Sequence, residues 1–168
     1  YKERKSMNDI LLMTDFSELS EFARDLADKV SYNLGANLHV LKVVDVPSDV
    51  QIGSDNSLIG GMSTDLRSFE KEKEESNTQM SSWTSKLKSK HESSVVYGRL
   101  HDSVHNYIDE HKIELVVMGT HGVSGVKELL SGSVTEHVIM KNHVPVLSLK
   151  CNREDLEFGL IKGACTRV

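Results

Sequence analysis

The chain has 168 residues, of which 38% are hydrophobic and 27% are charged, and its formal net charge is −5. These values predict one globular domain and argue against a general nucleic-acid binder, whose affinity depends on cationic contacts to phosphates. No apolar run is long enough to span a membrane and no leader pattern is visible, so we expect a cytoplasmic protein without a membrane partner.

The first part of the chain predicts two strands joined by a helix. Residues 9–14 form a short apolar run, typical of a buried strand, which stops at Asp15. Apolar residues at helical spacing follow, with Ser17 placed as the N-cap and Gly35 placed where a helix ends. Residues 37–46 predict the second strand.

The middle of the chain begins with a polar segment, residues 48–64, that contains three glycines. It is too long for a simple connection and predicts a flexible loop, which would be able to act as a lid. Residues 65–91 predict a helix whose early turns project into solvent, and residues 93–100 predict the third strand, followed by a short helix.

The last part predicts a fourth strand at 113–120, a helix at 133–142 and a fifth strand at 144–149. Strands that alternate with helices and are apolar along most of their length are typical of a parallel sheet covered on both faces. The sequence therefore predicts an α/β fold with one open five-stranded parallel sheet and helices on both of its faces.

In such open sheets, ligands bind outside the carboxyl ends of the strands, where the strand order switches direction. Asp15, residues 43–45 and Gly119 all fall at predicted strand ends. We expect them to meet in one crevice.

The fourth strand leads into a glycine-rich segment with the spacing Gly119-x2-Gly122-x9-Gly132-Ser133. This is neither a P-loop nor a dinucleotide fingerprint. Residues 133–136 match a capping box, so Gly132 stands directly before a helix N-terminus, where free N–H groups favour an anion. The glycines would let the backbone approach a phosphate chain, although they would equally serve to shape turns while Ser133 caps its helix.

These segments resemble the universal stress protein family over residues 8–150. The resemblance rests on MTDFS at 13–17, VVD at 43–45 and the long segment at 116–150. The glycine–serine spacing is the one that marks the nucleotide-binding branch of that family. The resemblance implies the sheet order 3-2-1-4-5, counted in chain order, and a nucleotide-binding domain at 1–150.

Position by position, the resemblance implies an adenine nucleotide site. Asp15 would lie near the ribose, Val43 would meet the adenine through its backbone, and Met118 would line the base pocket. The residues implied around the ribose and phosphates are Gly119, Gly122, Gly132, Ser133, Val134 and Thr135. Met13 departs from the proline that the family often has at its position, which affects the expected shape of the base pocket.

Several polar residues have a second interpretation. Asp15 would alternatively cap the helix that begins near Ser17. His121 and Lys127 lie inside the glycine-rich segment and would either contact phosphate or remain solvated.

A bound cation is expected with the nucleotide, because ATP would add about four negative charges to an acidic protein. Mg²⁺ or Mn²⁺ would bridge the phosphate oxygens, and Asp45 is a candidate to contribute through water. We expect no metal site formed by protein ligands alone. His101 and His105 have the i, i+4 spacing of a ligand pair but lack a third ligand, and the remaining histidines are expected at the surface.

The function predicted is an ATP-binding (or AMP- or ADP-binding) stress-response regulatory domain that acts as a nucleotide-dependent dimeric switch with an unidentified protein partner. Its fifth strand, 144–149, is expected at a sheet edge and would pair with a second copy. Two alternatives stay open: a slow ATPase or autophosphorylating protein, and a nucleotide-free dimeric scaffold. We expect no fast turnover, because no catalytic loop or P-loop lysine is present.

The tail at 151–168 contains both cysteines, Cys151 and Cys165, and is not expected to form a disulfide framework. It is either an ordinary C-terminal tail or the start of a second, truncated repeat.

Overall fold

The computed structural model describes residues 7–60, 65–119 and 134–149. The five strands predicted from the sequence are present, each within two residues of its predicted bounds. The elements in chain order are β1 (Asp9–Met13), α1 (Glu18–Leu34), β2 (Asn37–Asp45), β3 (Gln51–Ile52), β4 (Leu58–Gly60), α2 (Arg67–Thr84), β5 (His91–Gly98), α3 (Leu100–Glu110), β6 (Leu115–Gly119), α4 (Val134–Lys141) and β7 (Val146–Leu149).

The main sheet has the order β5-β2-β1-β6-β7, and every neighbouring pair in it is parallel. Counted along the chain without the small β3–β4 pair, this is the order 3-2-1-4-5, as predicted. The order switches direction between β1 and β6, since β2 lies on one side of β1 and β6 on the other. The carboxyl ends of β1 and β6 therefore stand side by side at the switch point.

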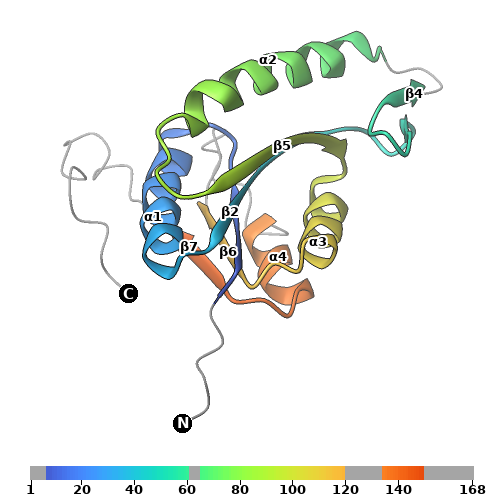
Figure 1. The fold of residues 1–168 in the computed structure, drawn as a ribbon. Coiled ribbons are helices and arrows are strands. Elements are labelled where there is room, and N and C mark those ends of the chain that lie inside the picture. Colours follow the sequence, from blue (N-terminus) through green and yellow to red (C-terminus); the bar gives the residue numbers. More distant parts are fainter. Residues whose placement is uncertain (1–6, 61–64, 120–133, 150–168) are drawn as a thin grey trace, which may run out of the picture.

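The two faces of the sheet are covered by different helices (Figure 1). α1 and α2 lie over one face, and α3 and α4 over the other. Alternate residues of each central strand go to opposite faces: Ile10 and Leu12 pack toward α1 and α2, whereas Leu11 and Met13 pack toward α3 and α4. This double covering explains why the central strands are apolar along most of their length.

α1 begins and ends as its sequence predicts. Ser17 has extended backbone angles and its Oγ accepts the N–H of Ser20, which is the N-cap interaction. Gly35 has φ +66° and donates its N–H to the carbonyl of Tyr32, so the left-handed residue that closes the helix is the glycine.

The prediction of a flexible loop at 48–64 is wrong for the part that is described. β3 and β4 pair as a two-stranded antiparallel hairpin. Its turn is closed by two backbone hydrogen bonds, from the N–H of Gly53 to Ser57 O (2.8 Å) and from the N–H of Asn56 to Gly53 O (2.9 Å). Asn56 has φ +58°, a conformation that asparagine tolerates well. Residues 61–64 lie outside the described part.

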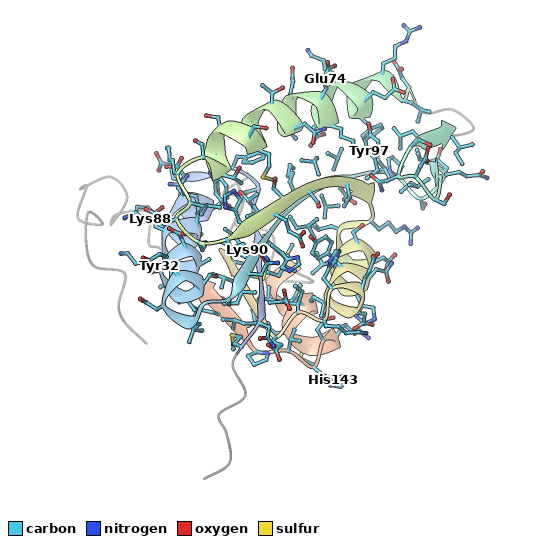
Figure 2. The ribbon with its side chains drawn as sticks, in the orientation of Figure 1. Tyr32, Glu74, Lys88, Lys90, Tyr97 and His143 are labelled. Atoms are coloured by element: carbon cyan, nitrogen blue, oxygen red, sulfur yellow. The ribbon has the colours of Figure 1, made fainter. Side chains whose placement is uncertain are left out.

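Side-chain contacts attach the hairpin to the main domain. The side chain of Asn56 pairs with the backbone of Tyr97 in β5, donating to its carbonyl (3.0 Å) and accepting its N–H (2.8 Å). Lys73 of α2 donates to Asn56 Oδ1 (2.8 Å) and lies 4.1 Å above the ring of Tyr97. In Figure 2, Tyr97 lies between α2 and the hairpin. Burial lowers the pKa of Lys73, although the Asp55 carboxylate opposes this shift.

The helix predicted at 65–91 ends earlier, at Thr84. Its C-terminal end is anchored by Met80 and Trp83, which are buried, and its early turns are mostly exposed, as predicted. The chain then turns, because the Asp28 carboxylate of α1 accepts the N–H groups of Lys88 (2.9 Å) and Ser89 (2.8 Å). These bonds direct the segment into β5 instead of continuing the helix.

Candidate functional site

The crevice is predicted at the carboxyl ends of β1 and β6, and the turn after β1 would form one side of it. The N–H of Thr14 donates to Leu41 O at 3.0 Å, which is the last bond of this strand pair. Thr14 Oγ1 then accepts the N–H of Phe16 at 2.9 Å, and Phe16 has φ +62°. A non-glycine residue in this conformation is uncommon, and here the Phe16 ring packs edge-on against Trp83, with 5.9 Å between the ring centres.

Asp15 is held at the N-terminus of α1. Its Oδ1 accepts the backbone N–H of Ser17 (3.0 Å), the hydroxyl of Ser17 (2.6 Å) and the hydroxyl of Ser20 (2.5 Å). The structure therefore shows the helix-capping role that was the second interpretation of Asp15. Contact between Asp15 and a ribose remains a prediction, and the two roles are compatible because a carboxylate has two oxygens and several lone pairs.

Val43 and Met118 approach the same crevice from β2 and β6. Their side chains are 6% and 4% exposed and belong to one apolar cluster, which also contains Val138 of α4. In the observed register, Met13 is opposite Leu41, so the N–H and C=O of Val43 face the β1 side beyond the end of that strand. The predicted adenine contact through the Val43 backbone is geometrically available. The Met118 side chain packs in this apolar cluster, and its contact with a base remains a prediction.

Gly119, the last residue of β6, has a packing reason to be glycine. A Cβ built there would lie 2.8 Å from Cγ and 3.0 Å from Cδ2 of Leu19 in α1. Such distances are shorter than van der Waals contact, so any larger residue at 119 would displace the Leu19 side chain from its place in the core. This packing against Leu19 is an alternative explanation for the glycine at 119, beside the ligand contact that the sequence predicts.

The rest of the predicted phosphate site is only partly described. Gly122, Gly132 and Ser133 lie outside the described residues, as do His121 and Lys127. Val134 and Thr135 form the first turn of α4, and their side chains are likewise not described. The bounds of β6 and α4 nevertheless show that the motif starts at the last residue of a strand and ends directly before a helix.

Asp45, the candidate for cation binding through water, ends β2. Its Oδ1 accepts the N–H of Leu100, the first residue of α3, at 3.1 Å. Asp45 therefore caps α3 much as Asp15 supports α1.

Next to Asp45, a cavity of about 320 Å³ opens at the carboxyl ends of β2 and β5, where the base of the hairpin meets α3. The sequence did not predict it, because it depends on the hairpin. Its polar lining comes from Ser48, Arg99, Asp102, Ser103 and Asn106.

The histidines correct another expectation. His39 of β2 is 3% exposed and is not a surface residue. The sequence indicates the burial of His39 through its position in the strand, because its alternate neighbours Leu41 and Val43 are core residues on the same face. By contrast, His105 lies on the surface of α3. Its Nδ1 is 2.8 Å from Asn142 Oδ1, and its Nε2 is 3.6 Å from Asp109 Oδ2.

None of the described helices is long and apolar enough to cross a membrane.

Comparison with known proteins places this fold in a family. The model of the universal stress protein family matches residues 7–150. Universal stress protein MJ0577 of Methanocaldococcus jannaschii is 30% identical over 151 residues, which cover 84% of this chain and 93% of that protein. A solved structure of MJ0577 superposes with a TM-score of 0.68 at 26% identity, and covers 89% of this chain and 99% of its own.

Two further solved structures share the fold and were determined with nucleotides. A universal stress protein in complex with cAMP has a TM-score of 0.56 and 20% identity, and covers 87% of this chain and 98% of its own. The universal stress protein from Archaeoglobus fulgidus in complex with dAMP has a TM-score of 0.58 and 20% identity, and covers 84% of this chain and 96% of its own. Because the family model matches residues 7–150, which include all of the described residues, this chain belongs to the universal stress protein family.

Proposed function

We propose that this protein binds an adenine nucleotide at the carboxyl edge of its sheet, between β1 and β6. The observation that carries the proposal is the placement of the glycine–serine motif. Its first glycine, Gly119, ends β6 at the switch point of the sheet, and its last residue, Ser133, immediately precedes α4. A phosphate chain held there would meet the N–H groups and the positive end of the α4 dipole.

Two other features support the same site. The backbone of Val43 faces the crevice from β2, where it can hydrogen-bond the edge of a base. Two family members with this fold were solved with cAMP and with dAMP, both of which are adenine nucleotides. We further propose that ATP is the ligand in the cell and that Mg²⁺ or Mn²⁺ accompanies its phosphates.

The binding test uses nucleotide-free protein, isothermal titration calorimetry and thermal unfolding. ATP with Mg²⁺ should bind with one site per chain, and at about one hundred times the dissociation constant it should raise the unfolding free energy by about 2.7 kcal/mol. AMP and cAMP, titrated alongside, report how much of the affinity comes from the β- and γ-phosphates.

The matched control for this test is Gly132→Val, which places a branched side chain two positions before the first residue of α4 and should abolish the effect of ATP. If ATP, AMP and cAMP all leave the wild-type unfolding temperature unchanged, the nucleotide proposal is wrong and the scaffold alternative stands.

Binding without fast turnover is the proposed mode of action. The measurement is release of ADP from ATP over hours, with Gly132→Val as background. Steady ADP production clearly above that background would favour the slow ATPase alternative.

We also propose that the protein forms a homodimer through β7 and that nucleotide binding changes the surface of this dimer. β7 is an edge strand of the main sheet, and Leu147 on it is 37% exposed. The adjacent α4 carries two further exposed apolar side chains, Ile139 (51%) and Met140 (75%). Exposed apolar side chains beside a strand edge that pairs with no other described strand are typical of a pairing surface.

The dimer test is Leu147→Glu, with Ile59→Glu as a control at an exposed apolar residue of the hairpin. Leu147→Glu should convert a dimer to a monomer in sedimentation equilibrium, whereas Ile59→Glu should leave the dimer intact. A wild-type protein that sediments as a monomer at high concentration would rule out the switch model, with or without nucleotide.

A further inference from the structure

Ionisable side chains gather at the opposite, amino-terminal edge of the sheet, away from the proposed nucleotide site. Asp9 of β1, His39 of β2 and Glu92 of β5 lie on three adjacent strands. His39 pairs in register with Glu92, and the alternation of strand residues puts all three side chains on the face covered by α3. His111, which follows the last residue of α3, completes the group.

His39 lies between two carboxylates. Its Nε2 is 3.0 Å from Asp9 Oδ1, and its Nδ1 is 2.7 Å from Glu92 Oε1. A carboxylate only accepts hydrogen bonds, whereas a neutral imidazole carries one N–H and one lone pair. The same ring has two further polar neighbours, since Nε2 lies 3.3 Å from Asn37 Nδ2 and Nδ1 lies 3.4 Å from the Tyr107 hydroxyl. Two carboxylates on opposite sides of one imidazole form a surrounding that suits a bound cation.

His111 brings a second imidazole to the same point. Its Nδ1 is 4.0 Å from Glu92 Oε1, and its ring centre is 5.1 Å from that of His39. Tyr107 stacks on His111 with 4.0 Å between ring centres, which fixes the imidazole plane. Within the described part of the chain, the candidate ligand atoms of His39, Glu92 and His111 all lie within 4.8 Å of one another.

We propose that His39, Glu92 and His111 form a binding site for a divalent transition metal such as Zn²⁺. In tetrahedral zinc sites the ligand atoms lie about 2.1 Å from the metal and so about 3.4 Å from each other. The observed separations bracket this value, and small side-chain rotations would open the His39–Glu92 contact and close the His111–Glu92 gap. Two imidazoles with one carboxylate favour Zn²⁺ over Mg²⁺ or Ca²⁺, which prefer oxygen ligands.

The surroundings match those of a metal site in three respects. Asp9 Oδ1 lies 3.0 Å from His39 Nε2, and a carboxylate beside the second ring nitrogen is the usual partner of a metal-bound histidine. Glu92 and His111 are 52% and 33% exposed, so a metal ion and a completing water can enter from solvent. Finally, His111 lies at the C-terminus of α3, where the negative end of the helix dipole favours a cation.

A metal at this position would join β2, β5 and the end of α3. It would act on a different part of the fold from the nucleotide, so the two proposals can be tested separately.

The experiment uses nucleotide-free, tag-free protein with Cys151→Ser and Cys165→Ser, because cysteines also bind zinc. Zn²⁺ is titrated by calorimetry, with Mg²⁺ as the contrasting cation. We expect one Zn²⁺ per chain, and at saturating metal a rise in unfolding temperature of about 5 °C or more. Mg²⁺ should give no such rise in the absence of nucleotide.

The decisive variants are His111→Gln and Glu92→Gln, chosen because both residues are partly exposed and their loss should leave the fold intact. Each should weaken zinc binding by at least about 100-fold, since even loss of an outer partner costs 10- to 100-fold. Asp9→Asn should fall within that smaller range. His105→Gln, at an exposed histidine of the same helix that also faces a carboxylate, should bind zinc like the parent.

Cobalt provides a second measurement. Co²⁺ bound by two imidazoles and a carboxylate should give an intense visible band that His111→Gln abolishes and His105→Gln retains. The absence of saturable Zn²⁺ binding, or equal affinity in the His111→Gln and His105→Gln variants, would overturn the proposal.

Discussion

The two ends of the sheet use polar side chains in different ways. At the carboxyl edge, two acidic residues at the ends of strands contact helix N-termini. Asp15, two residues after β1, contacts Ser17 and Ser20 at the start of α1, and Asp45, the last residue of β2, contacts the N–H of Leu100 at the start of α3. At the amino edge, the ionisable residues lie on the strands themselves and contact one another, as His39 and Glu92 do.

This difference follows from the topology. Each crossover helix of a parallel sheet starts near the carboxyl edge, so helix N-termini with free N–H groups gather there and favour anions. Each helix ends near the amino edge, where carbonyl groups and the negative ends of the dipoles favour cations. The backbone alone therefore favours phosphate at the carboxyl edge and positively charged groups at the amino edge, whatever the side chains there.

The largest effect is expected at Gly119, where the end of β6 packs closely against Leu19 of α1. Gly119→Val should lower the free energy of unfolding by about 3 kcal/mol, because its Cβ would overlap Leu19. Urea denaturation followed by circular dichroism measures this change.

A double-mutant cycle separates packing from ligand contact at this glycine. In a Leu19→Ala background, Gly119→Ala should cost no more than about 0.5 kcal/mol beyond Leu19→Ala alone, since the overlapping atoms are gone. If the double variant folds yet fails to bind ATP, then Gly119 also serves the ligand. If Gly119→Ala is equally damaging in both backgrounds, the Leu19 contact is not the cause.

An intermediate effect is expected at Asp28, the carboxylate of α1 that fixes the entry into β5. Burial raises the pKa of this carboxyl, but hydrogen bonds from Ser89 and Lys88 outweigh burial and leave the pKa below its ordinary value of 3.8. Because the folded pKa is depressed, the stabilisation is present above about pH 4 and is lost as the pH falls through the folded pKa.

Asp28→Asn should therefore destabilise the protein by about 1.5 kcal/mol at pH 7, where hydrogen bonds to a charged acceptor are lost. The difference from wild type should shrink below pH 4, as urea denaturation at several pH values would show. An equal difference at pH 7 and pH 3 would mean that the Asp28 charge contributes nothing at the amino edge.

The parts of the fold that were predicted correctly depend on local patterns. Ser17 and Gly35 mark the two ends of α1 within the chain itself, and the apolar runs mark the five strands. The hairpin was missed because Asn56 is fixed by the backbone of Tyr97, 41 residues away, and no local pattern contains that bond.

The same reasoning explains what was predicted of each edge. The glycine–serine motif is continuous in sequence, so the proposed nucleotide site can be named residue by residue. His39, Glu92 and His111 are separated by 53 and 19 positions. Strand register brings His39 beside Glu92, and the packing of α3 on the sheet brings His111 to them. Their spacing resembles no ligand motif, which is why the buried His39 was expected at the surface.

The smallest effect on stability is expected at Asp15, and it tests whether the carboxyl edge is used for structure alone. Asp15→Ala removes an acceptor at the start of α1 and should cost about 1 kcal/mol, within the range of lost N-caps. Ser20→Ala breaks the same network while keeping the carboxylate, so it is the matched control. If Asp15 also contacts the ribose, Asp15→Ala should weaken ATP binding at least tenfold more than Ser20→Ala, as measured by calorimetry. Equal affinities in the two variants would assign Asp15 to helix capping and leave nucleotide recognition to the backbone of the edge.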